Sequence, residues 1–220
     1  MPPDTMPPTT VPPEIRPPEV GPAETWATAP AARRDRHTPE SLLRVAVDVF
    51  THRGYDGTSM EHIAAASGIT KSSIYHHVRG KEELLRLALE RATDGLFAVL
   101  GEAPAQTGPA IGRLEHVVRR SVEVLAAELP YVTLLLRVRG NTPTEVWALD
   151  RRRTFDRAVA VLAATAVAEG DLRDDVDSRL ATRLLFGLVN SLTEWWRPDR
   201  GSVEQLADAI VHLAFDGLRR

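Results

Sequence analysis

Cysteine is absent from the 220 residues, so this chain forms no disulfide and offers neither a thiolate nucleophile nor a cysteine-based zinc site. It also lacks an apolar run near the ~20 residues of a membrane span. The N-terminus does not show the basic-then-apolar pattern of a signal peptide. A cytoplasmic protein with no membrane partner is therefore the simplest expectation.

The motifs of common enzymes are missing as well. We find no G-x-S-x-G, no G-x-G-x-x-G, no P-loop and no H-E-x-x-H segment. His76 and His77 are adjacent, and neighbours on a helix diverge by about 100°, so they make a poor metal pair. We expect no enzymatic activity, no cofactor and no metal.

Lysine is scarce, because the chain contains only Lys71 and Lys81, and the formal net charge is -3. That balance is not typical of a globally basic nucleic-acid binder. Residues 33–81, however, contain eight Arg/Lys, five Asp/Glu and five of the seven histidines. A locally basic segment on an acidic body favours a discrete DNA-binding domain.

Two short helices joined by a tight turn are predicted between Thr58 and Lys81. Thr58 with Glu61 has the spacing of a capping box, and Gly68 supplies the left-handed residue that ends many helices. Thr70 then caps a second helix almost at once. Such a short turn makes the helices cross steeply, which predicts a helix-turn-helix. A merely solvated helix is the alternative, but the turn, the caps and the polar outer face agree on DNA.

The segment GYDGTSMEHIAAASGITKSSIYHHVRGKEELL resembles the DNA-binding signature of the tetracycline-repressor (TetR) family of bacterial regulators. The resemblance covers about residues 38–90. It implies an all-α homodimer with an N-terminal three-helix helix-turn-helix domain and a C-terminal helical domain for ligand binding and dimerisation. Its partner is then double-stranded operator DNA, a palindrome read by two recognition helices about 34 Å apart.

The family pattern also implies roles for matching residues. Phosphate contacts are expected from Lys71, Tyr75, His77 and Lys81, and positions nearer the bases from Thr70, Ser72, Ser73 and His76. Thr58 and Ser59 complete the expected DNA-binding set.

Three regions are expected along the chain. Residues 1–32 are rich in proline, with Pro-Pro pairs at 2–3, 7–8, 12–13 and 17–18. This predicts a disordered or polyproline-like tail, with a docking ligand for another protein as the alternative. Residues 33–82 form the DNA-binding domain and begin with arginines that either touch DNA or are solvated. Residues 83–220 form the ligand-binding and dimerisation domain.

Helical patterns continue throughout the second domain. A long helix follows Lys81 as far as about Leu100, and Gly95 within it predicts close packing or a bend. We expect a loop over 101–108 and helices over 109–128, 130–139, 143–169, 178–196 and 203–218. The last two have wide apolar faces, which serve either a four-helix dimer interface or an internal core; the resemblance favours the dimer.

Two features could serve a ligand. The arginines from Arg137 to Arg157 could bind phosphates, or could form a solvated face with local pairs such as Arg152–Asp156. The segment FGLVNSLTEWWRPD resembles a segment of TetR-family regulators of fatty-acid and steroid breakdown, which sense acyl-CoA thioesters. Residues expected to line an effector cavity are Phe97, Leu114, Leu135, Arg137, Trp147, Phe155, Phe186, Asn190 and Trp195.

The sequence therefore predicts a ligand-responsive repressor that a small-molecule effector releases from a palindromic operator. An acyl- or aryl-CoA thioester is the favoured effector, and a free acid is its main rival. The first alternative is an activator or architectural DNA binder without an effector. The second is an enzyme on a regulator-like fold, which needs an acid/base pair inside the cavity.

Overall fold

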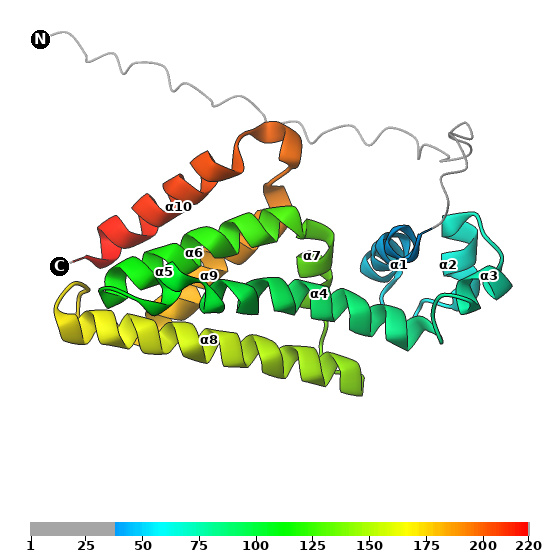
Figure 1. The fold of residues 1–220 in the computed structure, drawn as a ribbon, viewed down its shortest axis with the longest axis horizontal. Coiled ribbons are helices and arrows are strands. Elements are labelled where there is room, and N and C mark those ends of the chain that lie inside the picture. Colours follow the sequence, from blue (N-terminus) through cyan, green and yellow to red (C-terminus); the bar gives the residue numbers. More distant parts are fainter. Residues whose placement is uncertain (1–37, 220) are drawn as a thin grey trace, which may run out of the picture. The chain divides into compact units, whose positions relative to one another are not determined.

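The computed structural model describes residues 38–219, and the predicted proline-rich tail and the arginines at 33–36 lie outside this range. The described residues contain ten α-helices, one short 3-10 helix and no strand. Figure 1 shows how these helices are arranged. The elements are α1 Pro39–Arg53, α2 Met60–Ser67, α3 Lys71–Tyr75, α4 Lys81–Gly101, α5 Ala103–Gln106, α6 Ala110–Ala127, α7 Leu129–Arg137, α8 Pro143–Glu169, α9 Ser178–Trp195, η1 Pro198–Arg200 and α10 Val203–Leu218. The all-α prediction is confirmed.

The first helix begins where its local signals predict. Thr38 is extended, its hydroxyl accepts the N–H of Ser41, and Pro39 occupies the first helical position, where its missing N–H costs nothing. Leu42, Ala46 and Phe50 are buried on one face of α1. This face packs against α2, α4 and α7.

The predicted cap of α2 is wrong by one residue. Ser59, not Thr58, is the N-cap: its hydroxyl accepts the N–H of His62, while the His62 ring accepts the N–H of Ser59. A histidine thus takes the place that a Glu or Gln usually has in a capping box. Thr58 is buried instead, and its hydroxyl donates to the carbonyl of Gly54 at 2.7 Å. Gly68 ends α2 with φ 69°, as predicted.

The long helix α4 connects the helix-turn-helix to the C-terminal helices. It packs on α1 and also contacts α6, α7 and α8. At Gly95 a Cβ atom would lie 2.9 Å from Cγ1 of Val124, which is closer than real Cβ atoms approach. Close packing between α4 and α6 therefore explains this glycine.

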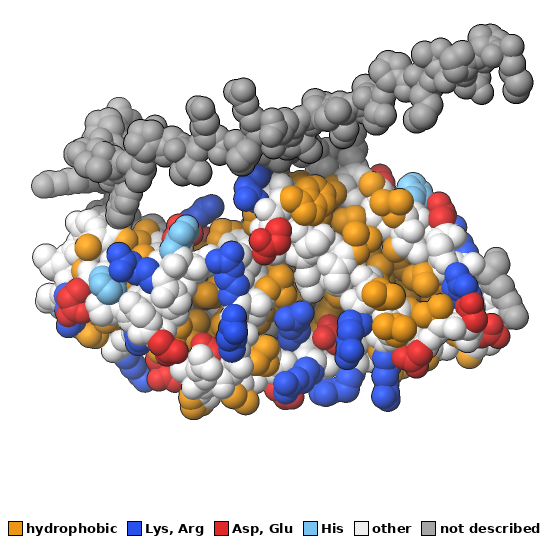
Figure 2. Space-filling model, turned by 180° about the vertical axis from the view of Figure 1, so that it is seen from behind, with side chains coloured by type: hydrophobic (Ala, Val, Ile, Leu, Met, Phe, Trp, Pro, Cys, Tyr) orange, Lys and Arg blue, Asp and Glu red, His pale blue; other side chains and the backbone are white. Residues whose placement is uncertain are grey.

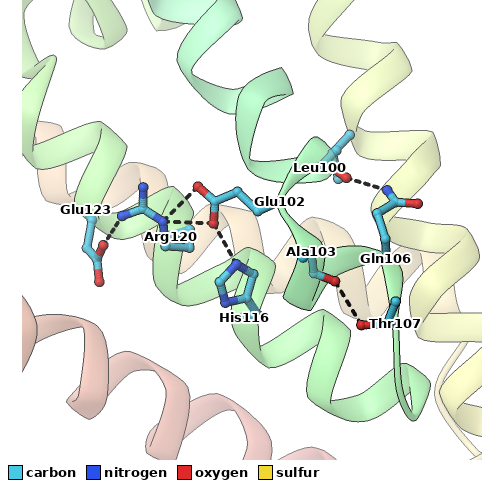
Figure 3. Close-up of polar contacts among 8 residues, drawn as sticks. All are labelled: Leu100, Glu102, Ala103, Gln106, Thr107, His116, Arg120 and Glu123. Carbon is cyan, nitrogen blue, oxygen red and sulfur yellow. Dashed lines mark hydrogen bonds and ion pairs between the residues drawn. The ribbon is translucent and has the colours of Figure 1, made fainter.

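The predicted loop over 101–108 contains the short helix α5, and a polar cluster holds it (Figure 3). The Glu102 carboxylate contacts His116 Nε2 at 2.7 Å and accepts from Arg120 Nε at 3.1 Å. Arg120 also pairs with Glu123. Burial disfavours the charged form of Glu102, but His116 and Arg120 outweigh it, and the pKa of Glu102 is lowered. The cluster fastens the end of α4 to α6.

The remaining helices pack around α6. This helix contacts α10 on one side and α8 and α9 on another, and α9 lies along α8. One hydrophobic core runs through the described residues, from Leu42 in α1 to Phe215 in α10. Asp177 caps α9 by accepting the N–H groups of Arg179 and Leu180, as predicted.

Several apolar side chains of the last long helices remain outside that core. Leu180, Leu184 and Leu188, spaced four residues apart on α9, are 49%, 63% and 38% exposed, and Leu213 on α10 is 73% exposed. Figure 2 shows hydrophobic side chains gathered on the right of the view, over the part of the molecule formed by the C-terminal helices. Leu192 and Ile210 from the same predicted faces are buried, so the apolar residues divide between the internal core and the surface.

Candidate functional site

The helix-turn-helix presents a short polar surface built on α3. Thr70 caps α3: its hydroxyl accepts the N–H of Ser73 at 3.2 Å and lies 3.0 Å from the Ser73 hydroxyl. Ser72 is exposed beside them, whereas Ile74 is fully buried and anchors the helix. The small hydroxyl residues thus face outward, which suits close approach to a DNA groove.

Tyr75, His76 and His77 follow at the end of α3. The helix ends at Tyr75, with His76 as its C-cap, so the two histidines lie in a turn rather than on a longer helix. All three side chains are exposed, Tyr75 by 48%. Their aromatic and imidazole groups therefore flank the Thr70–Ser73 surface.

Lys71 lies at the start of α3 and pairs with Glu61 of α2. The hydrogen bond to Lys71 lowers the pKa of Glu61 to about 2, and the same contact raises the pKa of Lys71. Both side chains are exposed, so the pair is open to exchange for a phosphate. Ser59, the cap of α2, is half-buried, and Thr58 is 3% exposed.

Lys81, at the start of α4, contacts the turn that precedes α2. Its ammonium donates to the carbonyls of Tyr55 at 3.1 Å and Thr58 at 3.0 Å and lies 4.4 Å from the centroid of the Tyr55 ring. One of its three hydrogens is left for a phosphate. Lys81 therefore joins the start of α4 to the turn before α2.

A second candidate site lies in the C-terminal helices. An inner cavity of about 20 Å³ is enclosed by side chains from five helices, α4, α6, α7, α8 and α9. Its lining is mostly apolar and includes Phe155 and Phe186, whose ring centroids lie 5.5 Å apart. The lining residues are Leu96, Ser121, Leu125, Val132, Leu135, Leu136, Arg152, Phe155, Asp156, Phe186, Val189 and Asn190.

An open groove of about 1000 Å³ runs between α8 and α9. Five arginines and two aspartates line it, a formal excess of three positive charges. The arginines are Arg152, Arg153, Arg157, Arg179 and Arg183. Within the described part of the chain, none of the five forms an ion pair with a carboxylate at 4.0 Å or less. A groove of this charge suits an anion with several negative groups.

Four residues line both the cavity and the groove: Arg152, Asp156, Phe186 and Asn190. We call them the neck. Burial raises the pKa of Asp156, although the charges of Arg152 and Arg183 act in the opposite direction. The two spaces thus adjoin each other across these four side chains, with the mostly apolar space inside and the basic groove outside.

The predicted cavity residues divide into two groups. Leu135, Phe155, Phe186 and Asn190 line the site as expected. The ring of Phe97 lies behind Phe155, with centroids 6.1 Å apart.

The other predicted cavity residues lie elsewhere. Leu114 is part of the buried core, and Trp195 is 51% exposed, while its neighbour Trp196 is buried. Trp147 stacks on Arg86, whose guanidinium carbon is 3.4 Å from the ring centroid. Arg137 donates to the carbonyl of Thr51 at 3.0 Å.

Arg179, Arg183 and Ser121 are among the contributors to the site that were missed from the sequence. Arg179 and Arg183 come from α9 and line the groove because α9 packs on α8. Ser121 is 1% exposed and lines the cavity with a hydroxyl that has no partner among the described residues. A serine within an apolar helical face was the available signal for it.

Comparison with known proteins bears on both sites. Residues 42–88 match the model for bacterial regulatory proteins of the tetR family, and residues 107–218 match the tetracyclin repressor-like C-terminal domain. The chain belongs to the TetR family. It is therefore a DNA-binding transcriptional regulator rather than an enzyme.

Solved TetR-family structures support this assignment. A member from Streptomyces coelicolor A3 is 64% identical, with 83% of this chain and 93% of that chain covered and a TM-score of 0.78. The structure of AibR in complex with isovaleryl coenzyme A and operator DNA is 26% identical, covers 80% of this chain and 97% of AibR, and has a TM-score of 0.67. Among curated proteins, the transcriptional repressor KstR2 of Rhodococcus jostii is 28% identical over 80% of this chain and 89% of its own length.

TetR-family regulators bind operator DNA and act as dimers. In residues 38–219 no helix combines the length and the apolar character that crossing a membrane requires. The same residues contain no cluster of three or more metal-ligating His, Asp or Glu side chains.

Proposed function

We propose that this TetR-family regulator is a repressor that leaves a palindromic operator when an acyl-coenzyme A thioester binds in the site between α8 and α9. The observation that carries the proposal is that the apolar cavity and the basic groove adjoin each other and share four lining residues. An acyl chain matches the cavity, and the phosphates of coenzyme A match the unpaired arginines outside it. AibR, bound to isovaleryl coenzyme A, is a relative with a ligand of this class.

Binding must change the protein, because about 20 Å³ holds roughly one water molecule and not an acyl chain. The effector therefore favours a conformation with a wider cavity. Leu96 of α4 and Leu135 of α7 line the cavity, and both helices contact α1 of the DNA-binding domain. Widening the cavity would thus shift the helices that support the DNA-binding surface.

In the helix-turn-helix domain, we propose that four side chains lie near the bases of the operator: Thr70, Ser72, Ser73 and His76. Phosphates would be held by Lys71, Tyr75 and His77 and by the remaining hydrogen of Lys81. Pairing of the exposed α9 leucines across a two-fold axis would present two such surfaces to one DNA face.

Effector-driven release from DNA tests the proposal. The full-length protein would be bound to a duplex that it has selected from a random-sequence library, and octanoyl-CoA, octanoate and free CoA would be titrated separately. We expect release by octanoyl-CoA at concentrations where CoA alone has no effect. Release by octanoate and not by octanoyl-CoA would make the thioester proposal wrong.

A charge-matched pair of variants tests the groove. Arg153→Gln removes one groove arginine and should weaken the binding of octanoyl-CoA about tenfold. Arg173→Gln, whose side chain pairs with Asp175 away from the groove, should leave the affinity unchanged. Equal effects of the two changes would show that the groove does not hold the phosphates.

A further inference from the structure

Asp156 is a half-buried carboxylate whose position needs an explanation. Among the described residues, no N–H or O–H group donates a hydrogen bond to it, and no cation lies within ion-pair distance. Its recorded interactions are the longer-range charges of Arg152 and Arg183. A carboxylate that is partly shielded from water and lacks a donor costs stability, and carboxylates with a perturbed pKa gather at functional sites.

Its location suggests that function. Asp156 is the one acid lining the inner cavity in the described part of the chain, and it also lines the groove. It therefore stands where the apolar and basic parts of the site meet. An effector with its chain in the cavity must place the first polar group of its head beside this carboxylate.

Thioesters and free acids differ at that point. A thioester linkage is neutral, and its negative charges begin farther out, on the phosphates. A free fatty acid in the same position carries its full charge on the carboxylate at the neck. Like charges held close together in a poorly solvated place repel strongly.

We propose that Asp156 selects thioesters against free carboxylic acids. The inference rests on the proposed function and adds to it the residue that discriminates. Asp156 offsets the positive charge of Arg152 in the neck and of Arg183 in the groove, so a ligand carboxylate at the neck gains little attraction and meets a negative group. The neutral thioester avoids this repulsion, while its phosphates still meet Arg153, Arg157 and Arg179 in the groove.

Calorimetric titration of the full-length protein with octanoyl-CoA and with octanoate tests this proposal without DNA. Asp156→Asn keeps the shape of the side chain and removes its charge. We expect octanoate to bind this variant about ten to a hundred times more tightly than it binds the wild type. The affinity of this variant for octanoyl-CoA should differ from that of the wild type by less than about threefold. Asp150 is an exposed residue of α8 outside both spaces. Asp150→Asn makes the same charge change and should leave the affinity for both ligands unchanged.

The outcomes separate this inference from the proposed function. If wild type binds octanoyl-CoA and Asp156→Asn leaves the preference over octanoate unchanged, selection by Asp156 is wrong and the thioester proposal stands. If wild type binds octanoate better than octanoyl-CoA, or binds neither, both are overturned. A thermal melt checks folding of the variant, and Asp156→Ser provides a second neutral side chain that should show the same gain for octanoate.

Discussion

Lys81 provides a sharp test, because the family pattern makes it a phosphate contact whereas the structure engages it inside the protein. Lys81→Met keeps an unbranched side chain and removes the ammonium. The Thr58 carbonyl loses a donor at 3.0 Å, while the Tyr55 carbonyl keeps the N–H of Thr58 at 3.1 Å. The Tyr55 ring loses a cation at 4.4 Å.

The expected loss can be worked out from these contacts. A hydrogen bond from a charged group contributes about 1.5–3 kcal/mol, and an exposed cation–π contact about 0.5–1 kcal/mol. Since Lys81 is only half-buried and one carbonyl keeps a donor, we expect about 2 kcal/mol in total. For a body of this size that corresponds to a Tm lower by about 4–8 °C.

Lys71→Met is the matched comparison. Lys71 is exposed and paired with Glu61, so its loss should leave Tm nearly unchanged. Its effect should appear in DNA binding, where the slope of log K against log salt should become shallower by about 0.9, one phosphate's worth. Both variants would be measured by thermal melting at fixed protein concentration and by DNA binding at several salt concentrations.

The reverse pattern would contradict this assignment. If Lys81→Met has the Tm of the wild type but a salt slope shallower by about 0.9, Lys81 is a phosphate ligand and its internal hydrogen bonds contribute nothing measurable to stability. An unchanged slope in Lys71→Met would further show that the ion pair with Glu61 persists on DNA.

Three further predictions follow from the described contacts. Leu184→Glu places a charge on the exposed apolar stripe of α9, so sedimentation should show a shift toward monomer that the control Val146→Glu does not produce. Phe155→Ala should lower the free energy of unfolding in urea by about 3–5 kcal/mol, and a loss below about 1 kcal/mol would show that the ring is not tightly packed. Glu102, with its lowered pKa, stabilises the fold above the pKa of the unfolded state and loses this effect as pH falls through the folded value. Glu102→Gln should therefore lower Tm at pH 7, with the difference shrinking below about pH 4; a constant difference across that range would argue against the charge.

Signals that act over a few residues were read correctly from the sequence. Pro39 after Thr38, Gly68 at a helix end and Asp177 before α9 each act on the adjacent backbone, so they need no knowledge of the fold. The error at Thr58 arose within the same range, because two hydroxyl residues compete for one cap. The His62 ring reaching back to Ser59 decides between them.

The ligand site could be predicted only in part, because it depends on which helix faces meet. Phe155 and Phe186 are large apolar residues on inward faces, so hydrophobic periodicity finds them. Arg183 joins the site because α9 lies along α8, a tertiary contact that no local pattern encodes. Trp195 and Trp196 point about 100° apart at the end of α9, and packing buries the second.

The close packing at Gly95 holds α4 against α6 near the C-terminal end of α4, so a tilt of the helix about this point moves its N-terminal end most. Leu96, next to Gly95, lines the inner cavity. Lys81 lies fourteen residues from Gly95, or about 21 Å along the helix. A rotation of about 5° about that point moves the far end by about 2 Å, while the atoms beside the cavity hardly shift. In a two-fold symmetric dimer the two copies of α4 would tilt together, so the distance between the two DNA-binding surfaces would change by up to the sum of two such displacements. If the proposed effector widens the cavity beside Gly95, the resulting tilt of α4 would move the two DNA-binding surfaces out of register with successive major grooves.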